Sequence, residues 1–475
     1  MYIPRLKLAS VALGAVLLIC MAATHARIVQ ASGPATLTVS GTQWGVSSAY
    51  LGANEGSSGF NIADLQDLGI NTYRIYGGMS RWEAQDDDGV YGSPTIDQIK
   101  ANPGVINWAW WDNIMTNPPN GTDYWWSSDA APWMGNARTM LQQLHDNNIK
   151  VVLVLRNRDN NGNPTWMANP PVTQADWNEW WEHVFATVYW LNVRNNYGVD
   201  DFEVHNEPDK SGQGWGGTEA QYEQLVQQTA DAIHYVYATY LPGRTPHIYA
   251  PVTAACCAWA DQLMRDLGPT VFDSLDFHDY QSNVLPEAET LHGYMNSDGF
   301  ANANVVVSEH GSWHQNVYDS QGNGNSLIIA NWIRASSPGN DHVWGMHLFS
   351  LYDWGSYASG AIHGCCSKTP GYYAMRIAAR ALTGARPTYQ VSSSNSYLVS
   401  VATTDSTGAV YLISCNTGTR AVTVDVNLSA LKTSGTGTQW EYSSVNLDAV
   451  VASPTLSNGH VTVTIPGNGT TLLKF

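Results

Sequence analysis

The chain has 475 residues, enough for two or three domains with a large buried core. It carries 40 acidic and 22 basic residues, which gives a formal net charge of −18 at neutral pH. An acidic protein repels phosphate-rich partners, so the composition argues against binding to nucleic acid and to anionic membrane surfaces. Only 13% of the residues are charged. This low charge content suits a secreted protein that handles neutral polar polymers.

Residues 1–31 have the pattern of a secretory signal peptide. Arg5 and Lys7 supply its positive end, Leu8–Ala23 is an apolar stretch of 16 residues, and Val29–Ala31 offers a small-residue cleavage site. The apolar stretch is shorter than the ~20 residues that span a bilayer. We therefore expect a secreted, extracellular protein with no membrane association in its mature form. An uncleaved anchor is the alternative.

The segment from residue 32 to residue 384 predicts an α/β fold, a (β/α)8 TIM barrel. Short apolar runs alternate there with helix-like stretches, a pattern typical of parallel strands joined by crossover helices. The clearest predicted helix is Asp176–Leu191, whose apolar residues recur on one helical face, and the next is Glu219–Tyr237. The eight predicted strands are Val46–Asn54, Thr72–Tyr76, Lys150–Arg156, Phe202–Asn206, His247–Thr253, Leu275–Tyr280, Asn304–Glu309 and Val343–Leu351.

A long insertion, from Gly78 to about Pro132, follows the second predicted strand. It is rich in Trp, Asp, Asn and Gly. Loops of this length are usually functional or disordered. The many tryptophans argue against disorder, so we interpret the insertion as functional.

Residues 385–475 predict a separate C-terminal β-sandwich domain. Helical periods end near Gly384 and alternating β-patterns take over. The segment Ala35–Thr42 also alternates, and we expect it to return to this domain as an extra strand. The predicted strands are Ser396–Thr403, Val410–Cys415, Val422–Leu428, Trp440–Tyr442, His460–Ile465 and Thr470–Lys474.

Five cysteines remain once the signal peptide is removed. Cys256 and Cys257 are adjacent, Cys365 and Cys366 are adjacent, and Cys415 lies in a strand-like run. Secretion permits disulfides, and an odd number leaves at least one thiol unpaired within the chain. We expect Cys415 to be a buried free thiol. The two adjacent pairs can each close on themselves or pair with each other.

Two glutamates carry most of the functional information in the chain. Glu207 ends the fourth predicted strand just before Pro208, and Glu309 ends the seventh just before a turn at Gly311. Barrels of this kind carry their chemistry at the carboxyl ends of the strands, so both carboxylates are expected at the barrel mouth. Glycoside hydrolysis needs such a pair, because one carboxyl protonates the leaving oxygen and the other attacks or activates water.

Alternation of side chains along the strands predicts neighbours for these glutamates. Three predicted strands each present a set of residues on one face: Thr72, Arg74 and Tyr76; Asp276, His278 and Tyr280; Val305, Val307 and Glu309. An arginine near a nucleophilic carboxylate keeps it ionised, and a tyrosine hydroxyl can orient it. Asn206 and Glu207 are adjacent, so a regular strand cannot aim both inward. Either the strand ends in an irregular step, or only one of the two side chains reaches the substrate.

Three motifs resemble the retaining glycoside hydrolases of the barrel clan, and glycoside hydrolase family 39 most closely. They are Phe-Glu-Val-His-Asn-Glu-Pro-Asp (residues 202–209), Leu-Asp-Phe-His-Asp-Tyr (residues 275–280) and Val-Val-Ser-Glu-His-Gly (residues 306–311). The segment at residues 215–222 is also similar to what that family places after its Asn-Glu-Pro motif. The resemblance covers residues 44–384 in pattern.

The resemblance implies that Glu207 is the acid/base and that Glu309 is the nucleophile, with retention of configuration at the sugar. It also implies that Asn206 bonds the sugar hydroxyl next to the scissile bond. Glu207 must then start protonated, with a raised pKa, whereas Glu309 must start ionised.

The resemblance further implies a set of supporting residues. His278 and Tyr280 are expected to support the site, and Arg74 is expected beside Glu309. His310 and His314 form a His-x-x-x-His pattern, but neither a Glu-x-x-His motif nor a predicted helix accompanies it. We therefore expect no metal site and no cofactor.

Tryptophans outside the predicted helices are candidates for stacking on the flat C–H faces of sugar rings. Trp125 and Trp126 lie in a stretch rich in Gly, Asn and Ser, and Trp354 follows the eighth predicted strand. By contrast, Trp177, Trp180 and Trp181 lie on a helical stripe and are expected in the core.

These patterns predict a secreted retaining glycoside hydrolase that cuts within a polysaccharide, since the insertion at residues 78–132 could wall an extended cleft. One alternative is an exo-acting β-glycosidase such as a β-xylosidase, in which the insertion closes a pocket. The other is a non-catalytic carbohydrate-binding protein on an enzyme scaffold. The expected partner is a polysaccharide or oligosaccharide.

Overall fold

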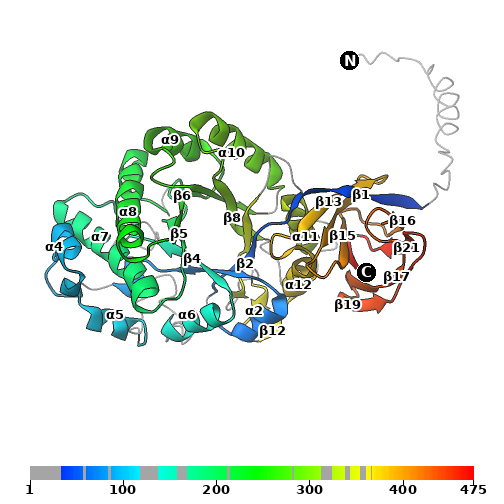
Figure 1. Cartoon of the computed structure of the whole chain (residues 1–475), viewed down its shortest axis with the longest axis horizontal. Helices are drawn as coiled ribbons and strands as arrows, with labels where there is room; N and C mark the ends of the chain where they lie inside the picture. Colours follow the sequence, from blue (N-terminus) through cyan, green and yellow to red (C-terminus); the bar gives the residue numbers. More distant parts are fainter. Residues whose placement is uncertain are drawn as a thin grey trace, which may run out of the picture.

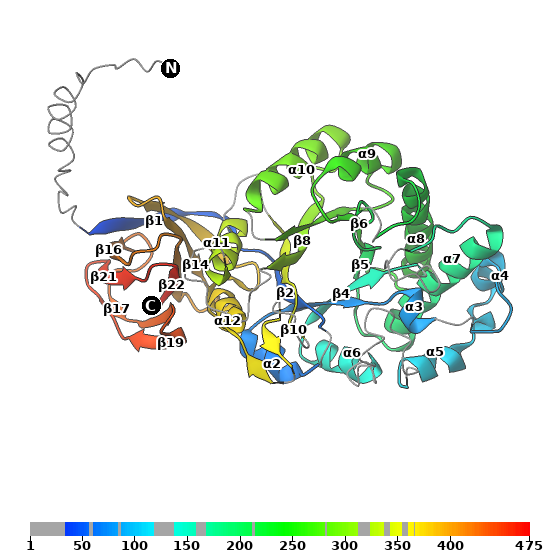
Figure 2. The same cartoon turned by 180° about the vertical axis from the view of Figure 1, so that it is seen from behind.

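The computed structural model describes residues 34–56, 60–83, 87–117, 137–157, 168–210, 214–280, 283–311, 324–336, 343–353, 360–364 and 366–475. The predicted signal peptide and the side chains of Trp125, Trp126, His314, Trp354 and Cys365 lie outside these ranges. The described residues form two lobes, a barrel ringed by helices and a smaller lobe of β-strands beside it (Figures 1 and 2).

Eight parallel strands close into a barrel in the described part of the chain, in sequence order from β2 to β9. They are β2 Tyr50–Asn54, β3 Thr72–Tyr76, β4 Lys150–Leu155, β5 Asp201–Val204, β6 His247–Thr253, β7 Ser274–Tyr280, β8 Asn304–Gly311 and β9 Gly345–Leu348. Each overlaps one predicted strand, and β3 and β6 have the predicted bounds. The predicted (β/α)8 barrel is therefore confirmed.

Helices cover the outside of the barrel (Figure 1). The α-helices are α2 Ile62–Leu68, α3 Met79–Trp82, α4 Ile96–Ala101, α5 Trp108–Ile114, α6 Ala137–Asp146, α7 Gln174–Tyr189, α8 Glu219–Tyr240, α9 Ala258–Leu267, α10 Leu285–Asp298, α11 Asn325–Ala335 and α12 Pro370–Leu382. Shorter turns are η1 Pro103–Val105 and η4 Trp190–Arg194. Within the described ranges, none of the helices combines the length and the apolar character that a membrane span requires.

The helix α7 shows how the sequence sets these elements. Thr173 and Asp176 form a capping box at its start, in which each side chain accepts a hydrogen bond from the other residue's backbone N–H. The stripe residues Trp180 and Trp181 are fully buried, as expected for a core position. The helix therefore begins at a cap and is held by the burial of its aromatic face.

The described part of the insertion is helical and packs into the barrel lobe, which differs from the expected cleft wall. Trp111 of α5 is fully buried, with its ring 5.8 Å from the ring of His183 in α7. Trp108 stacks on Tyr189 of the same helix at 5.1 Å between ring centroids. Because Trp108 and Trp111 are three residues apart, they lie on one face of α5, and that face packs against α7. Trp108 and Trp111 therefore stabilise the helix layer.

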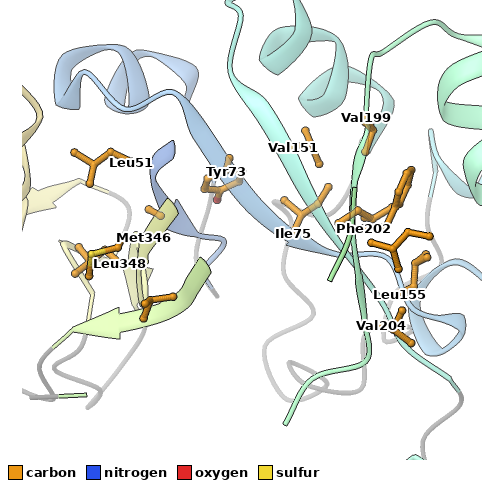
Figure 3. Packing of buried hydrophobic residues seen from close by; sticks show 14 of the residues in the cluster. Leu51, Tyr73, Ile75, Val151, Leu155, Val199, Phe202, Val204, Met346 and Leu348 are labelled. Atoms are coloured by element: carbon orange, nitrogen blue, oxygen red, sulfur yellow. The ribbon is translucent and has the colours of Figure 1, made fainter. Parts of the chain in front are cut away.

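Alternation along the barrel strands sorts apolar residues outward and polar residues toward the barrel axis. Tyr73 and Ile75 of β3 belong to one buried apolar cluster with Phe202 of β5 (Figure 3). The intervening residues Arg74 and Glu203 pair with each other at 2.6 Å with fully buried side chains. The barrel interior therefore holds a buried ion pair, Arg74 with Glu203, between β3 and β5.

A bulge in β8 decides where Glu309 points. Between two successive pairs with β7, β8 advances by three residues, from Val306 to Glu309, while β7 advances by two. Val305 and Val307 belong to the outer apolar cluster, whereas Glu309 meets the polar residues of the barrel mouth. The prediction that Val305, Val307 and Glu309 share one face is wrong, because the extra residue shifts the alternation by one.

The second lobe is a nine-stranded sheet in the described residues, in the order β19-β18-β22-β15-β14-β13-β1-β16-β21. Leu37 of β1, Leu398 of β14, Val424 of β16 and Leu473 of β22 share one apolar cluster, so the sheet folds over into the predicted β-sandwich. Its strands are β1 Ala35–Val46, β13 Pro387–Ser393, β14 Leu398–Thr404, β15 Val410–Asn416, β16 Val422–Asn427, β18 Thr438–Tyr442, β19 Leu447–Ala452, β21 His460–Ile465 and β22 Gly469–Lys474. Two-residue strands are β10 Tyr352–Asp353, β11 Ile362–His363, β12 Ser367–Lys368, β17 Gly435–Thr436 and β20 Thr455–Leu456.

The strand β1 sits inside this sheet, as expected for a returning segment. It pairs antiparallel with β13 and parallel with β16. Figure 1 shows it running among the C-terminal strands.

For Cys256 and Cys257, the structure shows the alternative in which an adjacent pair closes on itself. Cys256 and Cys257 are disulfide-bonded to each other. Cys366 is also disulfide-bonded. Cys415 is a buried free thiol, as expected, and burial raises its pKa to about 11, so it is unreactive at neutral pH.

Asp448 ties the sandwich to the barrel lobe. Its buried carboxylate accepts hydrogen bonds from Arg376 Nε at 2.5 Å and from Arg380 Nη2 at 3.0 Å, both on α12. Arg376 also donates to Asp67 of α2 at 3.0 Å. The two lobes therefore share a small network of charges centred on one anion.

We expect Asp448→Ala to lower the free energy of unfolding by about 1–3 kcal/mol, because it leaves two arginines at the interface without their shared anion. The loss stays below that of a fully buried pair, since the Arg376 and Arg380 side chains are 19% and 36% exposed. Urea denaturation measures it, with Asp425→Ala in an exposed position of the sandwich as the control. Equal losses in the two variants would contradict the role given to Asp448.

Candidate active site

The segment that carries Glu207 is an irregular step at the end of β5. His205 and Glu207 have φ angles of 69° and 47°, a left-handed region that residues other than glycine rarely adopt. The step lets both Asn206 and Glu207 reach the barrel mouth, which resolves the conflict between adjacent side chains. Such strain costs on the order of 1–3 kcal/mol per residue and is typical of functional sites.

Tight packing holds this step in place. A Cβ atom at Gly214 would overlap the carbonyl oxygen of Glu207, so only glycine fits there. The Lys210 N–H donates to that same carbonyl at 3.1 Å. The turn thereby returns the Lys210 side chain to the Glu207 carboxylate, where Nζ lies 2.7 Å from Oε2.

Glu309 is held from three sides. Arg74 Nη1 donates to Oε1 at 2.9 Å, and Tyr280 Oη donates to Oε2 at 2.5 Å. Tyr76 Oη lies 3.2 Å from Oε1. Asn206 is fixed by the same residues, since its Oδ1 accepts from Arg74 Nη2 at 2.8 Å. These bonds hold the Glu309 carboxylate in one orientation.

His278 links the two glutamates. Its Nδ1 lies 2.9 Å from Glu207 Oε1 and 3.4 Å from Glu309 Oε2. The polar atoms of the three side chains lie within 4.8 Å of one another. The Glu207 and Glu309 side chains are 14% and 7% exposed, so both reach the edge of solvent. One oxygen of each glutamate thus lies within 4.8 Å of the other, a proximity that favours the short carboxyl separation of about 5–5.5 Å in retaining glycosidases over the roughly 6.5–9.5 Å of inverting ones.

The pKa of Glu207 differs from the expectation for a resting acid. Burial raises the pKa of Glu207, but the hydrogen bonds and positive charges of His278 and Lys210 lower it by more. The result is a pKa of about 2. The raised pKa expected from the sequence is therefore absent in this arrangement, because His278 and, to a smaller extent, Lys210 both stabilise the carboxylate. The Lys210 side chain is 44% exposed. Its amine can leave Glu207 for solvent without unpacking the barrel, and its departure raises the pKa of Glu207.

A deeper layer fixes Arg74. Its Nη1 donates to Asn54 Oδ1 at 2.7 Å, and Glu203 pairs with it from below. Burial lowers the pKa of Arg74, but Glu203 and Glu309 raise it well above its ordinary value, so it stays charged. Burial and the charge of Glu203 raise the pKa of Asp276 well above its usual range. Arg74 is thus a permanent, immobile cation under Glu309.

Among the described residues, Glu207, His278 and Glu309 are the one group whose atoms are close enough to share a metal ion. The carboxylate oxygens already accept from Arg74 and Lys210. A divalent cation there would have to displace one ammonium and compete with a guanidinium, so this donor set fits carboxylate chemistry better than metal binding.

The structure brings six of the predicted site residues together at the barrel mouth: Arg74, Asn206, Glu207, His278, Tyr280 and Glu309. The predicted platforms Trp125, Trp126 and Trp354 lie outside the described residues. Tyr76, expected on the same strand face as Arg74, also lies at the barrel mouth, and three further contributors were missed: Asn54, Glu203 and Lys210.

Signals for some of these were present in the sequence. Tyr76 lies two residues after Arg74 and was expected on the same face, which places it beside the same carboxylate. Glu203 is a charge inside an otherwise apolar strand, which indicates a buried ion pair. Lys210 carries no such signal, because its position depends on the irregular turn.

No protein-family model matches the chain, and no curated protein matches its sequence. Solved structures do match its fold. A GH30 endoxylanase from Clostridium papyrosolvens C71 has a TM-score of 0.61 and 13% identity, over 92% of this chain and 99% of that one. The GH39 enzyme from Xanthomonas axonopodis pv. citri has a TM-score of 0.61 and 14% identity, over 93% and 97%. A monomeric β-xylosidase from Caulobacter crescentus CB15 has a TM-score of 0.61 and 14% identity, over 92% and 99%.

Identities this low carry information about the fold alone. The matches span both lobes, since they cover more than nine tenths of each chain. The expected likeness to glycoside hydrolase family 39 is therefore confirmed at the level of the fold, which the chain shares with solved structures of glycoside hydrolase families 30 and 39.

Proposed function

We propose that the protein is a retaining glycoside hydrolase with Glu207 as acid/base and Glu309 as nucleophile. The observation that carries the proposal is the pair of carboxyl groups bridged by His278 at the carboxyl ends of the barrel strands. The motifs at residues 202–209 and 306–311 supply these two residues from the strand positions that the resemblance implied. The shared fold with glycoside hydrolase structures supports the same conclusion.

The geometry supplies both steps of the reaction. Glu309 Oε attacks the anomeric carbon while Glu207 gives its proton to the leaving oxygen, which forms a glycosyl–enzyme ester and releases the first sugar product. Glu207, now a carboxylate, then takes a proton from water as that water attacks the anomeric carbon, which breaks the bond of that carbon to Glu309 and frees the carboxylate. Asn206 bonds the sugar hydroxyl beside the reacting bond. Arg74 and Tyr280 orient Glu309 throughout.

We favour an endo-acting enzyme on a polysaccharide. The aromatic packing of Trp108 and Trp111 removes part of the sequence argument for a long cleft, but one structurally similar protein is an endoxylanase. An exo-acting β-xylosidase is the second candidate, because one structurally similar protein is a monomeric β-xylosidase. A carbohydrate-binding protein without activity is the third, and the intact pair of glutamates speaks against it.

Product release from a panel of polysaccharides tests the proposal, with and without a chelator to exclude metal-dependent activity. We expect oligosaccharides with retained configuration, identified by NMR immediately after cleavage. Monosaccharide alone would favour the exo-acting candidate. Binding to a polysaccharide without any product would favour the binding protein and contradict the proposed chemistry.

We also propose that the protein is secreted, with residues 1–31 as its signal peptide. The Cys256–Cys257 disulfide is consistent with an oxidising compartment. Removal of three basic residues with the signal peptide leaves 40 acidic and 22 − 3 = 19 basic residues, a net charge of −21. N-terminal sequencing of protein from the culture medium tests this, and a chain that still begins at Met1 would contradict it.

Lys210→Met should move the alkaline limb of the pH profile to higher pH. Activity requires protonated Glu207, and the profile of kcat/KM falls as pH rises through the pKa of that group in the free enzyme. Lys210 lowers this pKa, so its removal raises the pKa and extends the active range upward. Lys432→Met, in the sandwich, is the control. An unchanged or acid-shifted limb would show that Lys210 does not set the protonation of Glu207.

A further inference from the structure

A pocket of 690 Å³ lies next to the catalytic pair, at the carboxyl ends of β6 and β7. Its walls include the Cys256–Cys257 disulfide, His278 and, from α10, Glu287 and Tyr294. The helices α9 and α10 that frame it lie side by side next to β6 in both views (Figures 1 and 2). The volume falls within the roughly 300–1,000 Å³ of sites that bind small molecules.

The pocket wall includes Tyr280, which bonds Glu309 at 2.5 Å, but its other contacts with the catalytic pair run mainly to the Glu207 side. His278, which forms part of its wall, bonds Glu207 at 2.9 Å. The loop after β5 is tied to the pocket as well, because Asp209 accepts a hydrogen bond from the Ala254 N–H at 2.7 Å. In a retaining glycosidase the acid/base carboxyl faces the departing sugar. A cavity on this side is therefore where that sugar would lie.

The disulfide gives this pocket an apolar, polarisable wall. Both cysteines line the cavity, and Cys256 is half-buried whereas Cys257 is buried. Both sulfurs contact the carbonyl oxygen of Glu287, at 3.6 and 3.9 Å. The disulfide, which joins two adjacent residues just before α9, therefore packs against the start of α10. Sulfur is soft and makes favourable contacts with C–H groups and rings.

Polar groups line the rest of the cavity. The carboxyl of Glu287, the hydroxyl of Thr290 and the half-buried Tyr294 lie along α10. Glu287 Oε2 is buried and has no hydrogen-bond partner among the described residues. One apolar wall and a polar rim match a sugar ring, which has a C–H face and a hydroxyl edge. The carboxyls of Asp279 and Glu287 disfavour an anionic sugar.

We propose that this pocket is the subsite for a neutral sugar residue on the leaving-group side, with the Cys256–Cys257 disulfide as the platform under its ring. The proposal rests on the glycosidase function proposed above and adds the position, the charge class and the platform of one subsite. Reduction or removal of the disulfide removes this platform and lowers affinity for sugar at this position.

The test compares two substrates of the double variant Cys256→Ser/Cys257→Ser. One is xylotetraose or cellotetraose, which fills the pocket, and the other is the matching 4-nitrophenyl glycoside, whose leaving group is not a sugar. We expect kcat/KM to fall about tenfold more for the tetrasaccharide, the ratio that corresponds to the loss of one good contact. Equal losses on the two substrates would overturn the proposal, because they indicate a general defect of the site. No loss on either would overturn it as well.

A reductant separates this disulfide from the one that contains Cys366. We expect tris(2-carboxyethyl)phosphine to reproduce the selective loss in the wild type and to add nothing in the double variant. Cys366→Ser is the control, which removes a disulfide-bonded cysteine that does not line the pocket. A selective loss in Cys366→Ser of the same size would overturn the assignment to Cys256–Cys257.

Binding measurements keep this proposal apart from the proposed function. Calorimetry with xylotetraose and cellotetraose on Glu309→Gln requires no turnover. We expect weaker binding when the two serine substitutions are added to that variant. If the wild type releases no product from any glycan, the proposed function fails, while this difference in affinity still supports the subsite. Equal affinity, or no binding of either tetrasaccharide, overturns the subsite.

Discussion

Glu309→Gln should lower kcat by on the order of 10⁵-fold, within the range seen when a covalent nucleophile is removed from an enzyme. The amide keeps the shape of the side chain, and its single oxygen can still accept from Arg74 while its NH2 group donates to the Tyr280 hydroxyl, but it cannot form the glycosyl ester. Release of reducing sugar from the polysaccharide that the wild type cleaves measures the loss. Glu219→Gln on the surface of α8 is the matched control and should retain full activity.

Rescue by an external anion identifies the role of Glu309. In Glu309→Ala, azide can enter the space of the lost carboxylate and attack the anomeric carbon directly. The expected product is a glycosyl azide with configuration opposite to that of the substrate. Retention of more than about one hundredth of wild-type activity in Glu309→Gln would exclude Glu309 as the nucleophile, since such a residue removed from a covalent mechanism costs far more.

Glu207→Ala should lower kcat by about 10²–10⁴-fold on the polysaccharide, the contribution typical of general acid catalysis. The loss should be much smaller for formation of the glycosyl–enzyme from a 2,4-dinitrophenyl glycoside, because that leaving group departs without a proton. Hydrolysis of the ester then becomes slow, so a burst of dinitrophenol should precede steady turnover. The alkaline limb of the pH profile should also disappear.

Azide distinguishes Glu207 from Glu309. In Glu207→Ala it attacks the glycosyl–enzyme from the face that water normally uses, and the expected product is a glycosyl azide with the configuration of the substrate. His460→Ala in the sandwich is an additional control, because it removes a titratable group far from the barrel strands. An equal loss on the polysaccharide and on the dinitrophenyl glycoside would contradict the acid/base role.

Much of the fold could be predicted from the sequence, because it depends on regular patterns among residues that are close together in the chain. Buried parallel strands read as apolar runs, and β3 and β6 were located to the residue for that reason. The position of catalytic carboxyls at strand ends follows from the barrel itself. Arg74 and Tyr76 could be paired from a spacing of two, because strand geometry is regular there.

The remaining features depend on departures from regular geometry. The bulge in β8 puts Val307 and Glu309 on opposite faces, and no residue type in β8 indicates a bulge. The left-handed backbone at His205 and Glu207 is an unusual choice for these residue types. Lys210 reaches Glu207 only because of that turn, so its effect on the acid could not be inferred from composition. Predictions that assume regular, unstrained backbone geometry are wrong where the surrounding structure imposes the arrangement of a functional site.

The place of β1 between β13 and β16 makes the two lobes a single folding problem. The first strand to leave the ribosome must wait for partners that are synthesised more than 300 residues later, after every strand of the barrel. A gene cut at residue 385 would give a barrel with an unpaired N-terminal strand and a sandwich missing an interior strand, both of which expose edges that favour aggregation. Neither lobe can therefore be transferred alone into a fusion protein. A fusion that contains the sandwich must also contain β1.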